Sequence, residues 1–180
     1  ALGTAGDVYL GGVDWTDRIV DHVGEQFMAE HNIDPRTDEC ALQSLINEAE
    51  DAKRALTARE QVSLMFSHEG CRLRTTLTRE WFEKATADLV DRTVTTVRKV
   101  LREAKVERKD VTRLLLVGGS SRIPAVQAVL EKGSGLEVDR SLSPDEAVGH
   151  GAAVYAALLA GNESDGIRDI AVKNVSSHDL

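Results

Sequence analysis

The chain has 180 residues, of which 42% are hydrophobic, 29% are charged and 4% are aromatic, a composition that excludes a wholly disordered protein. Its net charge of −8 argues against a protein that follows nucleic acid through phosphate contacts. No apolar run approaches the roughly 20 residues that span a bilayer, and no signal-peptide pattern opens the chain. We therefore expect a soluble protein of the cytoplasm that binds neither nucleic acid nor membrane.

The spacing of apolar residues predicts two helices and a hairpin in the first half of the chain. A helix is expected from about 13 to 31, because Ile19, Val20, Val23 and Phe27 recur at helical intervals. The breakers Asn32, Asp34 and Pro35 end it, and a second helix is expected from roughly 37 to 58. Apolar residues then alternate on both sides of Glu69-Gly70, which predicts a β-hairpin over 61 to 77.

The second half of the sequence predicts three helical segments and one buried strand. Thr78 is expected to cap a long helix with one break, whose inward face includes Val97. The apolar run from Leu114 to Val117 predicts a strand covered on both faces. A helix should follow from Pro124, and another should start with Ser143 as its N-cap and stop at Gly161.

Cysteine and histidine usage gives no catalytic signal. Cys40 and Cys71 stand apart without a CxxC motif, which predicts neither a zinc site nor a disulfide framework. The five histidines share no spacing, and no GxSxG or HExxH motif occurs. We therefore expect no hydrolytic triad and no metal ligands in this chain.

Four polar residues share one face of the second predicted helix. Glu50, Lys53, Arg54 and Thr57 are spaced at i, i+3, i+4 and i+7. The set suits a nucleoside, because a carboxylate and an ammonium can hold ribose hydroxyls, a guanidinium can stack on a base, and a hydroxyl can meet the base edge. The alternative is the ordinary ion pairing of a solvated helix face.

A glycine-rich turn follows the predicted strand at Leu114 to Val117. Gly118 and Gly119 allow a ligand to approach the backbone, and the N–H groups that open the next helix favour a phosphate. Ser120 lies in the same turn, and Arg122 adds a second flat cation. The alternative is a plain strand-to-helix turn, since the sequence is neither GxGxxG nor a Walker loop.

Four segments, in this order and spacing, carry a resemblance to a known family. They are Gly6 to Trp15, Glu50 to Thr57, Leu115 to Pro124 and Ser143 to Ala153. Together they closely resemble the second lobe of the ATPase domain of Hsp70 (DnaK) chaperones, over roughly residues 1 to 160. The resemblance implies an α/β fold of the actin-like (ribonuclease H-like) class, in which helices flank a mixed sheet.

The resemblance also implies a division of the chain. Residues 1 to 10 and 89 to 160 would form a base subdomain, and residues 11 to 88 a smaller tip subdomain of helices and a hairpin. Residues 161 to 180 would hold the interdomain linker and the start of a substrate-binding domain. This linker is less rich in leucine than is usual in the family, and the hairpin is slightly shorter, which leaves the exchange factor open.

In the family, adenosine of ATP or ADP lies between the two subdomains. By position, Glu50 and Lys53 would hold the ribose, and Arg54 and Arg122 would sandwich the adenine. Thr57, usually Ser, would meet a base nitrogen, and Asp145 would support the adenosine loop. Gly118, Gly119 and Ser120 would contact the phosphate side, and Gly12 would border the site.

The resemblance implies that this chain alone hydrolyses no ATP. The two phosphate loops of the family, with the Asp that coordinates Mg²⁺ and the Lys and Glu that position water, do not occur in the sequence. The chain also starts at Ala1 rather than Met, so we expect one lobe of a longer protein.

The expected function is adenine-nucleotide binding within an ATP-dependent chaperone that assists protein folding. The partners implied for the whole protein are a J-domain co-chaperone, a nucleotide exchange factor and unfolded polypeptide. The alternative from another class is an Hsp70-like scaffold that binds a partner without nucleotide control. A different actin-like ATPase, such as a sugar kinase, is disfavoured by the residues at 50 to 57.

Overall fold

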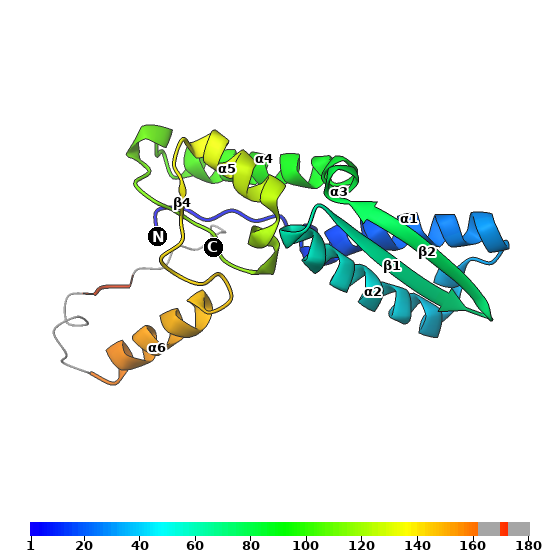
Figure 1. Cartoon of the computed structure of the whole chain (residues 1–180). Helices are drawn as coiled ribbons and strands as arrows, with labels where there is room; N and C mark the ends of the chain where they lie inside the picture. Colours follow the sequence, from blue (N-terminus) through cyan, green and yellow to red (C-terminus); the bar gives the residue numbers. More distant parts are fainter. Residues whose placement is uncertain (162–169, 173–180) are drawn as a thin grey trace. The chain divides into compact units, whose positions relative to one another are not determined.

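The computed structural model describes residues 1–161 and 170–172, and the chain divides into two compact units (Figure 1). The helix–hairpin unit comprises Asp7–Thr93 with Ile123–Ala125. The α/β unit comprises Ala1–Gly6, Val94–Arg122 and Val126–Leu180. The mixed α/β class expected from the sequence is confirmed.

Two helices of equal length open the helix–hairpin unit, and their boundaries follow the predicted signals. Helix α1 (Gly12–His31) ends at Asn32, whose φ of 58° lets its N–H donate to the carbonyl of Met28. The short 3₁₀ turn η1 (Pro35–Thr37) follows. Helix α2 (Glu39–Ala58) then begins where Asp38 accepts a hydrogen bond from the N–H of Ala41. Both predicted helices are confirmed.

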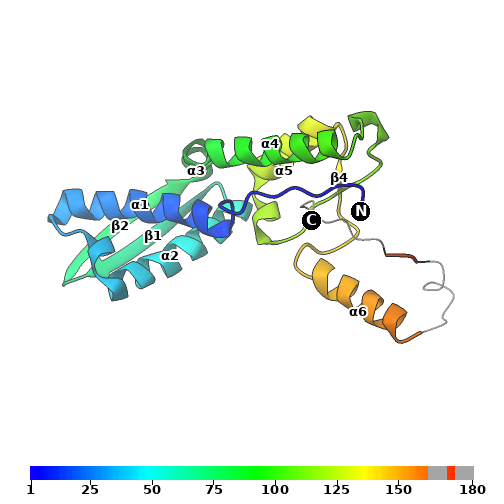
Figure 2. The same ribbon diagram turned by 180° about the vertical axis from the view of Figure 1, so that it is seen from behind.

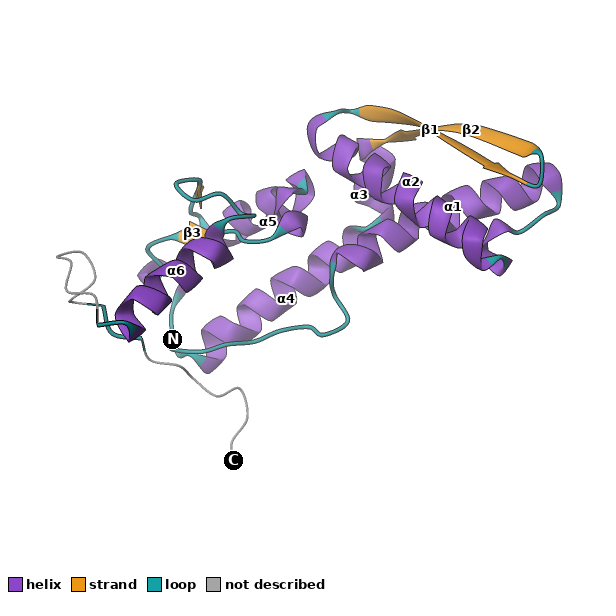
Figure 3. Ribbon diagram, turned by 90° about the horizontal axis from the view of Figure 1, so that it is seen from below, coloured by secondary structure: helices purple, strands orange, loops and turns teal. Residues whose placement is uncertain are grey.

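The predicted hairpin is also present and lies along α1 and α2 (Figures 1, 2 and 3). Strand β1 (Gln61–His68) pairs antiparallel with β2 (Cys71–Thr78) around a two-residue turn at Glu69-Gly70. Leu64 and Phe66 are buried from one strand and Leu73 and Leu77 from the other, so one face of the hairpin packs inward.

The long predicted helix is indeed broken once. Helix α3 (Arg79–Ala85) is capped by Thr78, which accepts from the N–H of Trp81, and α4 (Ala87–Glu103) starts after the buried Thr86. The side chain of Arg79 donates to the carbonyl of Leu56 at the end of α2 and pairs with Glu60. Its N–H also donates to the carbonyl of Glu60, so one residue joins α2, the hairpin and α3.

The core of this unit is formed by one face of each helix and by the hairpin. Phe27 of α1 is fully buried and meets Phe66 edge-on, with ring centroids 5.4 Å apart. The other buried apolar side chains include Trp15, Ile19, Val20, Val23, Leu45, Leu56, Leu77, Phe82 and Leu89. These side chains fix α1 against α2 and thereby position the polar residues at the start of α1 opposite those in the second half of α2.

The α/β unit has a two-stranded parallel sheet. Strand β3 (Leu114–Leu115) pairs with β4 (Val138–Asp139). The 3₁₀ turn η2 (Arg108–Asp110) precedes β3 in the chain. After β3 come the 3₁₀ turn η3 (Gly119–Arg122) and helix α5 (Pro124–Ser134), which begins at the proline as predicted. Helix α6 (Ala147–Leu159) ends the described elements.

Two burial predictions in this unit are wrong. Leu115 and Val117 are 52% and 51% exposed, so the strand is not covered on both faces. Among the described residues β3 has one neighbouring strand, which leaves alternate side chains of the run in solvent. Val97, predicted to face inward from α4, is 36% exposed.

The start of the last helix also differs from the prediction. Ser143 is not its N-cap, because residues 144 to 146 form a turn and the helix begins at Ala147. The backbone carbonyl of Ser143, rather than its hydroxyl, accepts from the N–H groups of Glu146 and Ala147. The predicted stop is confirmed, since Gly161 follows the helix. No residue of α6 is buried, although its sequence is almost entirely apolar.

Within residues 1–161 and 170–172, no helix is long and apolar enough to cross a bilayer. The predicted linker at 161 to 180 lies largely outside the described residues, which include only 161 and 170–172 of that stretch. The division into base and tip subdomains stays a prediction.

Candidate functional site

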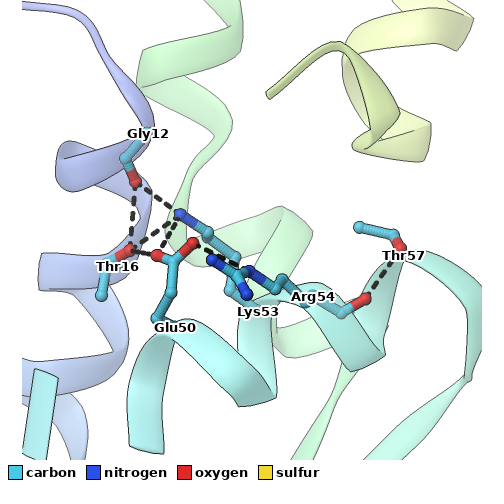
Figure 4. A network of polar contacts seen from close by, with 6 residues as sticks. All are labelled: Gly12, Thr16, Glu50, Lys53, Arg54 and Thr57. Atoms are coloured by element: carbon cyan, nitrogen blue, oxygen red, sulfur yellow. Dashed lines mark hydrogen bonds and ion pairs between the residues drawn. The ribbon is translucent and has the colours of Figure 1, made fainter. Parts of the chain in front are cut away.

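The first group of predicted site residues lies where the start of α1 faces the middle of α2 in the helix–hairpin unit (Figure 4). The ammonium of Lys53 is its centre. Lys53 Nζ lies 2.6 Å from Glu50 Oε2, 2.8 Å from the carbonyl oxygen of Gly12 and 2.9 Å from Thr16 Oγ1. Because an ammonium has three N–H groups, these three acceptors satisfy it completely. The predicted residues Gly12, Glu50 and Lys53 therefore form one network.

Thr16 completes this network and was not among the predicted site residues. Its hydroxyl lies 2.7 Å from Glu50 Oε2 and 3.1 Å from the carbonyl of Gly12. The one hydroxyl proton goes to the nearer and charged acceptor, Glu50, while the oxygen accepts from Lys53. A threonine one helical turn after Gly12 is the only sequence signal for this role, and the signal is weak without knowing which face α1 turns to α2.

The network sets the charge state of Glu50. Burial is the largest single influence and raises its pKa, but hydrogen bonds from Lys53 and Thr16 and the charges of Lys53 and Arg54 outweigh it. The pKa of Glu50 is therefore lowered, and its carboxylate is held in the ionised form. Lys53 is largely enclosed, with 11% of its side chain exposed, whereas Glu50 retains 33%.

Arg54 and Thr57 lie further along the same face of α2. Arg54 Nε is 3.3 Å from Glu50 Oε1, a long contact, and 72% of the arginine side chain is exposed. The Thr57 hydroxyl donates to the carbonyl of Arg54 at 2.7 Å. Arg54 is thus free to present a flat cation to a ligand, and Glu50 Oε1 is the less tightly held oxygen of its carboxylate.

The second group lies in the α/β unit, in the turn that follows β3. Gly118 has a φ of +90°, which favours glycine, and its N–H donates to the carbonyl of Pro144 at 3.0 Å. Its carbonyl accepts from both the N–H and the hydroxyl of Ser121. A Cβ atom at Gly118 or Gly119 would meet nothing within 4 Å, so the backbone here is open to an approaching group.

Arg122 pairs with Asp145 in this second group. Its guanidinium Nη2 contacts Asp145 Oδ2, and the two side chains are 51% and 56% exposed. The hydrogen bond from Gly118 to Pro144 and this ion pair tie the turn after β3 to the turn before α6. Ser120 lies in the same turn with intermediate exposure.

The predicted residues thus form two local groups, one in each unit. The groups are Gly12, Glu50, Lys53, Arg54 and Thr57 in the helix–hairpin unit, and Gly118, Gly119, Ser120, Arg122 and Asp145 in the α/β unit. Each group presents an exposed arginine beside a carboxylate, and the second adds open backbone. Their roles toward a nucleotide remain predictions.

A model of the family described as Hsp70 protein matches residues 1–180. The chain belongs to the Hsp70 family. Its mixed α/β structure agrees with the actin-like ATPase fold of Hsp70 proteins.

Curated Hsp70 relatives come from bacteria and eukaryotes. The chain is 40% identical over 182 residues to the chaperone protein DnaK of Thermotoga maritima, covering 97% of this chain and 30% of that protein. It is 39% identical to heat shock cognate 70 kDa protein 3 of Dictyostelium discoideum, covering 94% and 27%. It is 45% identical to the chloroplastic heat shock 70 kDa protein 6 of Arabidopsis thaliana, covering 91% and 24%. The chain therefore spans less than a third of each relative.

Proposed function

We propose that this chain is the second lobe of the ATPase domain of an ATP-dependent Hsp70 chaperone and that it binds the adenosine part of ATP or ADP. The partly buried Lys53–Glu50–Thr16 network supports this proposal most directly. It holds an ionised carboxylate at the edge of α2 with one oxygen, Oε1, oriented toward an exposed arginine. Such a carboxylate can accept hydrogen bonds from ribose hydroxyls.

The network also refines the roles of the individual residues. Lys53 has no N–H group left for a ribose, so it binds a ligand only by exchanging one of its three acceptors. We assign it first to positioning Glu50, which meets the sugar. Thr57 must release the carbonyl of Arg54 before its hydroxyl donates to a base nitrogen.

We propose that Arg54 and Arg122 each offer a guanidinium face on which adenine can stack, as the resemblance to the family implies. Both guanidinium groups are more than half exposed and each is paired with one carboxylate, Glu50 or Asp145. Stacking on a base leaves these hydrogen bonds intact, because a guanidinium uses its flat face for the base and its edge for the carboxylate.

The phosphates and Mg²⁺ are expected to depend on other parts of the whole protein. The open backbone at Gly118 and Gly119 fits a phosphate-side contact. In the described part of the chain, no three Asp, Glu, His or Cys residues are grouped to hold a metal ion. Because the sequence lacks the two phosphate loops of the family, we expect Mg²⁺ to be held by the nucleotide and by other parts of the whole protein, and no phosphate release from ATP by this chain alone.

For the whole protein, we propose control of unfolded polypeptide by ATP, with a J-domain co-chaperone and a nucleotide exchange factor as partners, in the cytoplasm. The relatives carry the names chaperone and heat shock protein, and they include both bacterial proteins and a chloroplastic one. Neither the family nor the described part of the chain favours a scaffold without nucleotide control.

Calorimetric titration with ADP tests the site. Arg54→Ala and Arg122→Ala should each weaken binding by about 1 kcal/mol or more, which is about five-fold or more in Kd. Arg59→Ala is the matched control, because Arg59 is an exposed arginine immediately after α2. Unchanged affinity in both site variants would overturn the sandwich, and absent ADP binding to the unmodified chain would overturn the proposed function of the isolated lobe.

A further inference from the structure

A pocket outside both groups of site residues lies in the α/β unit. It has a volume of about 610 Å³ and is formed by α4, the segment around η2 and β3, and the end of α5. This volume is within the range of about 300 to 1,000 Å³ that is usual for small-molecule sites.

Aliphatic side chains make up most of the lining of the pocket. Val97 and Leu101 come from α4, Leu114 from β3, and Val129 and Leu130 from α5. No aromatic side chain lines it. Gly133, near the end of α5, also lines the pocket, and a Cβ atom there would meet nothing within 4 Å. The pocket is thus left open partly because this helix position carries no side chain.

Three cationic side chains and no acidic one line the same pocket, in a chain with more acidic than basic residues. They are Arg98, Arg108 and Lys132. Within the described residues, none of the three forms a salt bridge, in contrast to the neighbouring Lys99 and Lys109, which pair with Glu103 and Glu107. The pocket therefore carries positive charge that no acidic side chain of residues 1–161 or 170–172 neutralises.

One of these cations is held in place by the backbone. Arg108 Nη2 donates to the carbonyl of Lys132 at 3.2 Å, at the end of α5. Gly135 has a φ of +71°, and a Cβ atom there would lie 2.6 Å from Arg108 Nη2. Glycine at this position thus permits the close approach of the guanidinium, which keeps most of its N–H groups for another acceptor.

The geometry points to this pocket as a binding site for an aliphatic carboxylate. The hydrocarbon chain lies among the valines and leucines, where its removal from water is favourable, and the carboxylate meets the cations at the rim. The site is separate from both groups of predicted nucleotide residues, so it does not rest on the proposed function.

Titration of the chain with dodecanoate, below the concentration at which it self-associates, tests this inference by calorimetry. Saturable binding of one molecule is expected. Gly133→Leu should weaken it ten-fold or more by filling the pocket. Because leucine favours helix more than glycine does, this variant should fold, which circular dichroism checks. Ala128→Leu, an exposed position of α5 outside the pocket, is the matched control and should bind normally.

The charge of the rim is tested separately. Arg108→Gln and Lys132→Gln should each weaken dodecanoate binding about two- to five-fold, as expected for exposed ion pairs. Arg102→Gln, on α4 but outside the pocket, should have no effect. Undiminished binding to Gly133→Leu, or equal binding of dodecylammonium and dodecanoate, would overturn the inference. Binding of an acidic peptide but not of dodecanoate would also overturn it and indicate a protein partner.

Discussion

In the helix–hairpin unit Phe27, Leu45 and Leu77 are almost wholly buried, whereas in the α/β unit Leu115, Val117 and Tyr155 are about half exposed. Among the described residues of the α/β unit, Val126 and Leu130 are the apolar residues that are buried. The first unit closes its core with its own residues, whereas the second leaves a strand and an apolar helix in solvent. Local stability should therefore differ strongly along one chain.

The largest expected effect follows from the core of the helix–hairpin unit. Phe27→Ala should lower its free energy of unfolding by about 3 to 5 kcal/mol, because it removes a fully buried ring. Leu159→Ala, at a 73% exposed position of α6, should change stability by no more than about 0.5 kcal/mol. Urea titration of tryptophan fluorescence measures the effect of Phe27→Ala, because Trp15 and Trp81 both lie in the helix–hairpin unit.

Circular dichroism provides the control for this comparison, because helices of both units contribute to it. In the unmodified chain the dichroism should begin to fall at lower urea than the tryptophan fluorescence. Coincident transitions would mean that the two units unfold together and that the difference in burial has no consequence for stability.

A smaller effect is expected at the two groups of site residues. Lys53→Met leaves Glu50 and Thr16 without their shared donor in a partly buried place, and should cost about 1 to 3 kcal/mol in urea unfolding. Arg122→Ala breaks an exposed ion pair and should cost no more than about 1 kcal/mol. Lys99→Met, which breaks an exposed pair with Glu103, is the control. Equal losses of unfolding free energy in Lys53→Met and Lys99→Met would argue against the network around Lys53.

The smallest expected effect is a dependence of folding stability on pH, which arises from Glu50. Because the pKa of Glu50 is lowered in the folded chain, its contribution to stability is complete above its ordinary pKa of 4.5. This contribution is lost as the pH falls through the lower pKa that Glu50 has in the folded chain. Glu50→Gln lacks this contribution, so its stability should fall less steeply than that of the unmodified chain between about pH 5 and about pH 3. Urea titrations of tryptophan fluorescence across this range measure the slope.

Glu48→Gln removes an exposed carboxylate from the same helix and should leave the slope nearly unchanged. The same slope in Glu50→Gln and in the unmodified chain would contradict the proposed charge state of Glu50.

Local signals were sufficient to predict most elements. Asn32 and Pro35 end one helix, and the alternation around Glu69-Gly70 specifies the hairpin, because each depends on the backbone preferences of neighbouring residues. The coverage of the run from Leu114 to Val117 was mispredicted, since burial depends on which other segments lie beside a strand. Ser143 was mispredicted for a different reason, because residues 144 to 146 form a turn before the helix and the carbonyl of Ser143 accepts from the N–H groups of Glu146 and Ala147.

The site was predictable in part. The spacing of Glu50, Lys53, Arg54 and Thr57 places them on one face of α2 whatever lies opposite. The contribution of Thr16, and the complete use of the Lys53 ammonium, depend on the packing of α1 against α2 and could not be derived from spacing. The contact between Arg122 and Asp145 joins residues 23 positions apart, and the spacing of residues within one helix contains no information about it.

Arg79 holds both ends of the hairpin at one point, since it binds the end of α2 and the residue that precedes β1, while β2 runs directly into α3. The far end of the hairpin is attached separately, because the imidazole of His31 at the end of α1 contacts the carbonyl of Arg72 in β2. The pairing register between these two ends is fixed, because a shift of one residue would turn Leu64 and Phe66 away from the helices. The hairpin therefore acts as a brace that links the end of α2 to the end of α1.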